Sequence, residues 1–254
     1  MARWVFATLA MVFFGALEAQ DLCNLQSCGG RQNVGCNPPP LTGGPSCAGK
    51  SASVITIDDA LKNLILDRHN SLRSQLASGN LTGFKAAVRM PTLVWDASLA
   101  TQAGNNARSC NYAHDACRNT ATYAWAGQNL AMKWYYGMTI SNQDLAKSAI
   151  DSWWSEYNVT TQAQIDSYPS TSVNPPIGHF TQMASDRTST IGCAMQKWLD
   201  GQYTSVYTVC DYSVTNVVST AVYKTGTSAS KCTNKNTQYP GLCAIGENVP
   251  ATPN

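Results

Sequence analysis

Imidazole and carboxylate side chains are the groups in this sequence best suited to chemistry, and the imidazoles are few. The chain has three histidines, His69, His114 and His179. Two imidazoles beside a carboxylate such as Glu156 could bind a divalent metal or supply a general base, because both tasks need free nitrogen or oxygen lone pairs. A single histidine on a helix is more often a surface or packed residue than part of a site. Spacing alone therefore defines no site.

No nucleophile motif accompanies the histidines. Neither HExxH nor GxSxG occurs in the chain. The ten cysteines are even in number and form no CxxC pair, which favours five disulfides over a zinc site. Charged residues make up 13% of the chain, the net charge is +2, and no run of Lys and Arg occurs. The sequence therefore gives no sign of a nucleic acid partner.

The N-terminus predicts a secretory signal peptide over residues 1–19. Arg3 precedes the apolar stretch Trp4–Leu17, and Ala19 is a small residue suited to cleavage. That stretch is shorter than the ~20 apolar residues of a membrane-spanning helix. We therefore expect a secreted, extracellular protein that is not integral to a membrane. Secretion also makes the sequons at Asn80 and Asn158 candidate glycosylation sites.

Composition divides the remaining chain into three parts. Residues 20–55 are rich in Cys, Gly and Pro, and they predict an irregular segment that disulfides hold in place. Residues 56–224 carry the periodic patterns of a folded domain. Residues 225–254 are predicted to form a short C-terminal tail with the last two cysteines.

Helical periodicity predicts three elements in the folded domain. Thr56 opens a capping box, and His69 then shares one stripe with apolar residues. Asp96 can cap the second helix and Ser141 the third, which is expected to carry Glu156. The predicted ranges are residues 56–77, residues 96–107, and residue 141 to the loop at 167–176.

Strand patterns occur late in the chain. An Asp-Gly pair at 200–201 predicts a tight hairpin between two apolar runs. Cys193 and Cys210 fall on its two arms, within bridging distance in a paired register. The predicted strands are residues 191–198, 203–212 and 217–223.

Several motifs in a fixed order resemble a known family. They are His69–Arg73, Gly127–Leu130 and Gly178–Met183, and together with the cysteines they are similar to the superfamily of cysteine-rich secretory proteins, antigen 5 and plant pathogenesis-related proteins (CAP). Cys110–Cys117 resembles insect antigen 5, the venom allergen type, and Tyr239–Cys243 resembles its fly members. The likeness covers nearly the whole mature chain.

This resemblance implies an α+β fold, a three-layer α-β-α sandwich, with a shallow central cleft. By position, the cleft residues are His69, Gln128, Glu156 and His179. Many relatives have Glu where this chain has Gln128. A neutral amide cannot act as a base, although it can orient a histidine. Two further departures, Ala184-Ser185 and Asp211, alter details of the same cleft.

The resemblance also implies a metal option and a disulfide pairing. Zinc in the cleft would use His69 and His179, although no cofactor is expected to be required. Two bridges would tie the N-terminal segment to the folded domain. The implied pairs are Cys23–Cys36, Cys28–Cys117, Cys47–Cys110, Cys193–Cys210 and Cys232–Cys243.

Three functions follow from the resemblance, and binding is preferred over catalysis. The first is an extracellular monomer that binds or scavenges a small hydrophobic ligand, such as a lipid, an eicosanoid or an amine. Seven Trp and eleven Tyr supply apolar lining, with the richest clusters at Trp134–Tyr136 and Trp153-Trp154. The alternatives are an extracellular protein-interaction factor in saliva, venom or the reproductive tract, and a metal-dependent hydrolase or peptidase.

Overall fold

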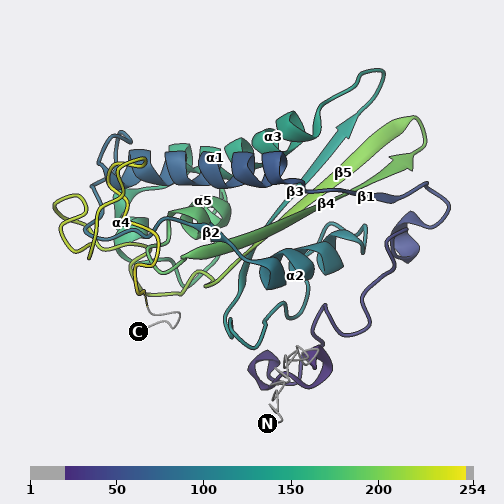
Figure 1. Ribbon diagram of the computed structural model, residues 1–254, viewed down its shortest axis with the longest axis horizontal. Helices are drawn as coiled ribbons and strands as arrows, with labels where there is room; N and C mark the ends of the chain where they lie inside the picture. The colour runs from purple at the N-terminus through teal and green to yellow at the C-terminus, as the bar shows by residue number, and fades with distance from the viewer. Residues whose placement is uncertain (1–20, 250–254) are drawn as a thin grey trace, which may run out of the picture.

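The protein folds into three layers, with helices on both faces of one β-sheet (Figure 1). The computed structural model describes residues 21–249. The predicted signal peptide lies outside this range and stays a prediction. Across residues 21–249, no helix is both long and apolar enough to cross a membrane. The α-β-α sandwich that the resemblance implies is thus the fold of this chain.

The sheet is built around the predicted hairpin. Asp200 pairs with Tyr203 around Gly201, whose φ of 62° suits a residue without a Cβ. The hydrogen-bonded order is β1-β4-β5-β3, and β2 pairs in parallel with β4. Its strands in the described part of the chain are β1 (Ser53–Ile55), β2 (Val94–Trp95), β3 (Gly127–Tyr135), β4 (Thr190–Asp200) and β5 (Tyr203–Tyr212).

One strand was missed and one predicted strand is wrong, each for a physical reason. β3 was not predicted, because it opens with polar residues, Gln128 and Asn129, that face other polar groups in the structure. Residues 217–223 were predicted as a strand, but they form turns. Val222 and Tyr223 are buried in the core, so the apolar character of this segment reflects packing without strand pairing.

Helices cover the two faces of the sheet unequally. α1, α3 and α5 lie on one face and α2 lies on the other (Figure 1). The stripe of α1 that contains His69 is buried in the main core, as its 3.6-residue period requires. The bounds are α1 (Asp59–Ala77), α2 (Ala97–Ala107), α3 (Asn142–Trp154), α4 (Gln162–Asp166) and α5 (Gly178–Ala184).

Polar caps begin the three predicted helices. Asp96 accepts hydrogen bonds from the first turn of α2, and the Ser141 hydroxyl accepts one from the Asp144 N–H at 3.0 Å, as the sequence predicts. For α1 the prediction is wrong by two residues, because Asp58 and not Thr56 accepts from Leu61 N–H, at 2.8 Å. The helix therefore starts later than the expected capping box.

α3 is also shorter than expected. It ends at Trp154, and Glu156 lies in the following 3-10 turn, η4 (Ser155–Val159). Trp153 and Trp154 are buried in the core. The 3-10 turn redirects the chain so that the Glu156 carboxylate reaches the start of α5.

The ten cysteines form five disulfides. They are the same pairs that the resemblance implies: Cys23–Cys36, Cys28–Cys117, Cys47–Cys110, Cys193–Cys210 and Cys232–Cys243. The second and third pairs attach the N-terminal segment to the chain that follows α2. Because residues 21–52 have few buried apolar side chains, these bonds replace the core that the segment lacks.

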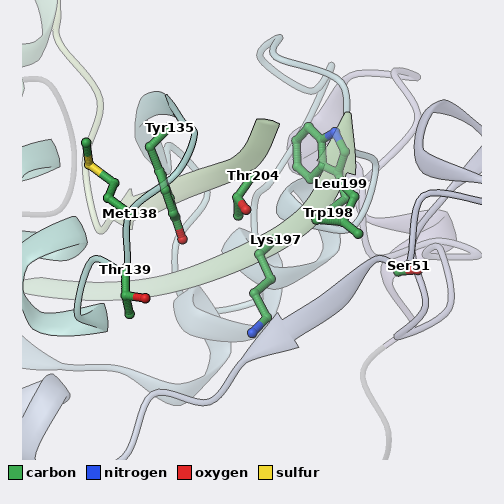
Figure 2. A pocket seen from close by; sticks show the side chains of 8 residues that line it. All are labelled: Ser51, Tyr135, Met138, Thr139, Lys197, Trp198, Leu199 and Thr204. Atoms are coloured by element: carbon green, nitrogen blue, oxygen red, sulfur yellow. The ribbon is translucent and has the colours of Figure 1, made fainter. Parts of the chain in front are cut away.

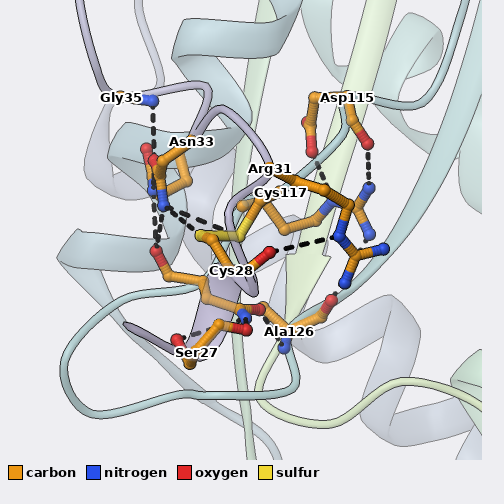
Figure 3. The surroundings of a disulfide bond; sticks show 11 residues. Ser27, Cys28, Arg31, Asn33, Gly35, Asp115, Cys117 and Ala126 are labelled. Carbon is orange, nitrogen blue, oxygen red and sulfur yellow. Dashed lines mark hydrogen bonds and ion pairs between the residues drawn. A yellow bond between two sulfur atoms is a disulfide. The ribbon is translucent and has the colours of Figure 1, made fainter. Parts of the chain in front are cut away.

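A buried amide reinforces the Cys28–Cys117 bond (Figure 3). Asn33 is 2% exposed, its Nδ2 donates to the Asn119 carbonyl at 2.8 Å, and its Oδ1 accepts from Gln102 Nε2 at 2.8 Å. The N-terminal segment is therefore fixed to α2 by polar contacts as well as by disulfides.

The C-terminal segment is packed onto the domain and is not a loose tail. Leu242 and Cys243 are 0% exposed, and the Pro240 carbonyl accepts from Ser78 Oγ at 2.8 Å. At Gly241, with φ of 86°, an added Cβ would lie 2.7 Å from the Ser78 nitrogen. This glycine thus permits the close approach to the end of α1.

Candidate functional site

Two imidazoles face a polar cleft beside the start of α5. The cleft encloses about 470 Å³, and His114, Gln128 and His179 contribute to its wall. We call it the histidine cleft. Its other lining residues are Arg118, Asn129, Tyr168, Pro176, Gly178, Gln182, Thr215 and Asn216.

Glu156 fixes the orientation of His179. Its Oε1 lies 2.7 Å from His179 Nδ1, and its Oε2 accepts from the N–H groups of His179 and Phe180 at 2.8 and 3.0 Å. With Nδ1 facing the carboxylate, Nε2 is the ring nitrogen of His179 that remains available to the cleft. The carboxylate itself has both oxygens engaged.

Gln128 does the same for His114 through its amide. The Gln128 Oε1 lies 2.8 Å from His114 Nδ1, so that nitrogen carries the proton. Gln128 Nε2 donates to Asp115 Oδ2 at 2.8 Å and to Asp211 Oδ1 at 2.9 Å. The amide nitrogen is assigned to the end that faces these two carboxyl groups.

Electrostatics in this region follow from burial. Burial, followed by the charge of Asp115, raises the pKa of Asp211 well above its usual range. Burial also lowers the pKa of His114, which favours a neutral ring. The acidic side chains next to position 128 are Asp115 and Asp211, and both contact the neutral amide of Gln128.

His69 is not in the cleft, and its expected place there is wrong. It is 0% exposed inside the core, its Nδ1 lies 2.8 Å from the Ile65 carbonyl, and its Nε2 lies 3.0 Å from the Tyr212 hydroxyl. Burial lowers its pKa to about 4. The helical stripe that contains His69 places it on the inner face of α1, which the sequence pattern already showed.

His114 takes the position that we had expected for His69. It lies in the loop between Cys110 and Cys117, which carries no periodic pattern, so its direction could not be predicted from spacing. The signal available was the Cys110–Cys117 motif, since two disulfides fix this loop against the rest of the chain.

His69 still supports the cleft from within the core. The Tyr212 hydroxyl that contacts His69 also lies 3.3 Å from Asn129 Nδ2, which donates to the His179 carbonyl at 3.1 Å. Three side chains and the His179 carbonyl therefore form one hydrogen-bonded series from α1 to α5. Its role in the described geometry is to hold α5 and its histidine in place.

The donors present do not fit a resident zinc ion. Only the Nε2 atoms of His114 and His179 are left free, whereas zinc sites in proteins use three or four protein ligands. Among residues 21–249, no group of three His, Cys, Asp or Glu side chains is placed to hold a metal. The expected pair of His69 and His179 is excluded as a chelate, because His69 is enclosed in the core.

A second cavity opens at the far end of the sheet (Figure 2). It encloses about 380 Å³ and has a more apolar wall than the histidine cleft. Tyr135 comes from the end of β3, and Lys197 brings one cationic group to the rim. We call it the sheet-end pocket. Its other lining residues are Ser51, Met138, Thr139, Trp198, Leu199 and Thr204.

Comparisons with known proteins agree with this fold. A model of the cysteine-rich secretory protein family (CAP) matches residues 66–212, which is more than half of the chain. Venom allergen-1 of Aedes albopictus is 40% identical over 242 residues, covering 94% of this chain and 93% of the relative. The antigen 5 like allergen Cul n 1 of Culicoides nubeculosus is 41% identical over 154 residues, 61% of this chain and 69% of the relative.

A solved structure, NaASP2 with Zn²⁺, matches with a TM-score of 0.62 and 26% identity, over 73% of this chain and 96% of that one. A three-layer sandwich with an imidazole-lined cleft and paired cysteines defines the class, a CAP domain. The chain belongs to the cysteine-rich secretory protein (CAP) family and is of the antigen 5, or venom allergen, type. This membership and the disulfides fit an extracellular location.

Proposed function

We propose that this protein is an extracellular binding module for a small amphipathic ligand, held in the sheet-end pocket. The supporting observation is the combination of an apolar wall, formed by side chains such as Tyr135 and Leu199, with the single ammonium of Lys197 (Figure 2). A cavity of this size is within the range of small-molecule sites. The chemistry suits an apolar chain that ends in a carboxylate.

The histidine cleft is less suited to such a ligand. Its wall is formed mainly by amide, imidazole, guanidinium and hydroxyl groups, which lose hydrogen bonds with water when an apolar chain covers them. We therefore assign the ligand to the sheet-end pocket and a structural role to the histidine cleft.

Binding is also favoured over hydrolysis by the state of the carboxylates. Both oxygens of Glu156 accept hydrogen bonds from α5, and Gln128 has no basic group. A general base at Glu156 would have to give up one of these bonds before it could accept a proton from water. No described group supplies the nucleophile and the oxyanion donor that a hydrolase needs in addition.

The test is titration of the purified protein with dansylundecanoic acid, followed by fluorescence. Saturable binding is expected, with weaker affinity in Leu199→Ser and in Lys197→Gln. The dansyl-labelled alcohol of the same chain length should bind wild type and Lys197→Gln alike, because it carries no charge for the ammonium to pair with. Ile245→Ser, which alters an exposed apolar residue elsewhere, is the matched control. Equal binding by all variants would reject this pocket.

A further inference from the structure

Large apolar side chains gather, exposed, at the free end of the sheet. Trp134 and Tyr136 are 57% and 58% exposed. They lie at the end of β3 and just after it, next to the turn that joins β4 to β5. Figure 1 shows these strand ends running past α2 and α3. We call this group the aromatic tip, and it consists of Trp134, Tyr136, Met138, Leu199 and Tyr203, all exposed.

The fold holds these residues in place without burying them. Trp134 pairs with Ser205, which pairs in turn with Trp198, so both indoles lie on the face of the sheet that α2 covers. Trp198 is 6% exposed because the core beneath α2 reaches it, whereas Trp134 lies beyond that core. The rings of Tyr136 and Tyr203 contact each other at a tilt of 56°, with centroids 6.0 Å apart. The tip is therefore an ordered surface.

Two lysines lie on the other face of the same strand ends. Lys133 and Lys197 both pair with Val206, one from each side, so the two ammonium groups leave the same face of the sheet, the face opposite to Trp134. Lys50 lies 3.0 Å from Asp200 beside the β4–β5 turn. Neither Lys133 nor Lys197 forms an ion pair within residues 21–249.

We propose that the aromatic tip docks on the surface of membranes that contain anionic phospholipids. Trp and Tyr are enriched where hydrocarbon meets water, because their rings are apolar and their N–H or O–H groups remain hydrated. Lysine stems lie along the hydrocarbon boundary while the ammonium groups meet anionic headgroups. A protein partner fits less well, since lysine is depleted from the centres of protein–protein interfaces.

The direct test is cosedimentation of the mature protein with vesicles. Vesicles of phosphatidylcholine alone are compared with vesicles of an equal mixture of phosphatidylcholine and phosphatidylserine. We expect binding to the mixed vesicles that weakens as salt is raised. Lys133→Gln and Lys197→Gln should each weaken it about fivefold, because one lysine near an anionic surface contributes ~1 kcal/mol.

Two triple variants, each replacing three exposed apolar side chains by serine, distinguish the aromatic tip from the rest of the surface. The triple variant Trp134→Ser, Tyr136→Ser and Tyr203→Ser should lose vesicle binding and keep the wild-type melting temperature, because all three side chains are exposed. The matched control is Trp125→Ser, Val218→Ser and Ile245→Ser, which changes exposed apolar residues away from the tip. It should bind vesicles as wild type does.

Three results would overturn this proposal: wild type that ignores both kinds of vesicle, a tip variant that binds as wild type, or equal loss in the control. Membrane docking does not depend on the ligand in the sheet-end pocket. Titration of the tip variant with dansylundecanoic acid distinguishes the two proposals. That variant retains Lys197 and Leu199, so it should still bind this probe.

Discussion

His69 Nε2 lies 3.0 Å from the Tyr212 hydroxyl, with both residues 0% exposed. The His69 Nδ1 faces the Ile65 carbonyl, so it donates, and Nε2 is left to accept from the tyrosine. The bond at Nε2 requires a neutral ring, because an imidazolium has no lone pair there. This agrees with a pKa that burial lowers to about 4. A histidine that looked suited to chemistry is therefore a neutral core residue.

The first prediction concerns acid stability. The unfolded state takes up a proton on His69 near pH 6.5 and the folded state only near pH 4, so this residue makes stability fall as pH drops through that window. The change is on the order of 3 kcal/mol at most. Wild type and His69→Gln should differ most in melting temperature at neutral pH, and the difference should shrink toward pH 4.

Taking the difference in melting temperature between wild type and His69→Gln at each pH removes the contribution of Asp211. Its raised pKa acts with the opposite sign, because stability is lost as pH rises through the folded pKa. That residue is present in both proteins. A difference between wild type and His69→Gln that stays constant over the whole range would contradict a neutral, buried His69.

The second prediction concerns position 128. In Gln128→Glu, an anionic oxygen replaces the Nε2 donor that lies 2.8 Å from Asp115 Oδ2 and 2.9 Å from Asp211 Oδ1. We expect a loss of about 1–3 kcal/mol in unfolding free energy, and a larger loss at pH 8 than at pH 5. Thermal unfolding at both pH values measures it.

A second substitution checks the cause. Adding Asp211→Asn to Gln128→Glu gives the new carboxylate an amide donor, so part of the loss should be regained. Gln128→Met is the uncharged control and should show little dependence on pH. If Gln128→Glu is as stable as wild type, the carboxylates behind the amide do not constrain this position.

Features set by neighbouring residues could be predicted from the sequence, whereas features set by contacts between distant segments could not. The hairpin at Asp200-Gly201 and the cap at Asp96 were predictable because turn and cap chemistry acts within a few residues. The end of α3 was not, because Glu156 turns away to reach α5, a contact between segments 23 residues apart. The strand β3 was missed because its polar residues serve the site.

The histidine cleft shows the same limit. His179 and Glu156 were predicted together and do contact each other, at 2.7 Å. Between His69 and His114 the choice could have been made by periodicity, because a residue on the apolar stripe of a helix points into the core. No sequence pattern indicates where the side chain of His114 points, because disulfides place its loop.

The third prediction concerns zinc. With only two free imidazole nitrogens, the protein should lose zinc on dialysis against a mild chelator, and elemental analysis should find well under one equivalent. Any weak binding seen by calorimetry should disappear in His114→Ala and in His179→Ala, and persist in His69→Gln. Stoichiometric zinc that survives dialysis would contradict a two-ligand site.

The fourth prediction concerns the bond between Cys28 and Cys117. It joins residues 89 positions apart and fixes the N-terminal segment to the loop that carries His114 and Asp115 (Figure 3). In the double variant Cys28→Ser, Cys117→Ser, stability should fall by about 2–5 kcal/mol. Trypsin should then cut after Arg31 much faster than in wild type, which mass spectrometry of timed digests can follow.

The matched control removes Cys23–Cys36, a bond of separation 13 that lies within the N-terminal segment. That variant keeps the attachment to the domain, so its melting temperature should fall less. Its cleavage after Arg31 should also stay closer to that of wild type, because Asn33 remains anchored to Asn119 and Gln102. If both variants behave alike, the segment is held by these amide contacts, and the long-range disulfide adds little.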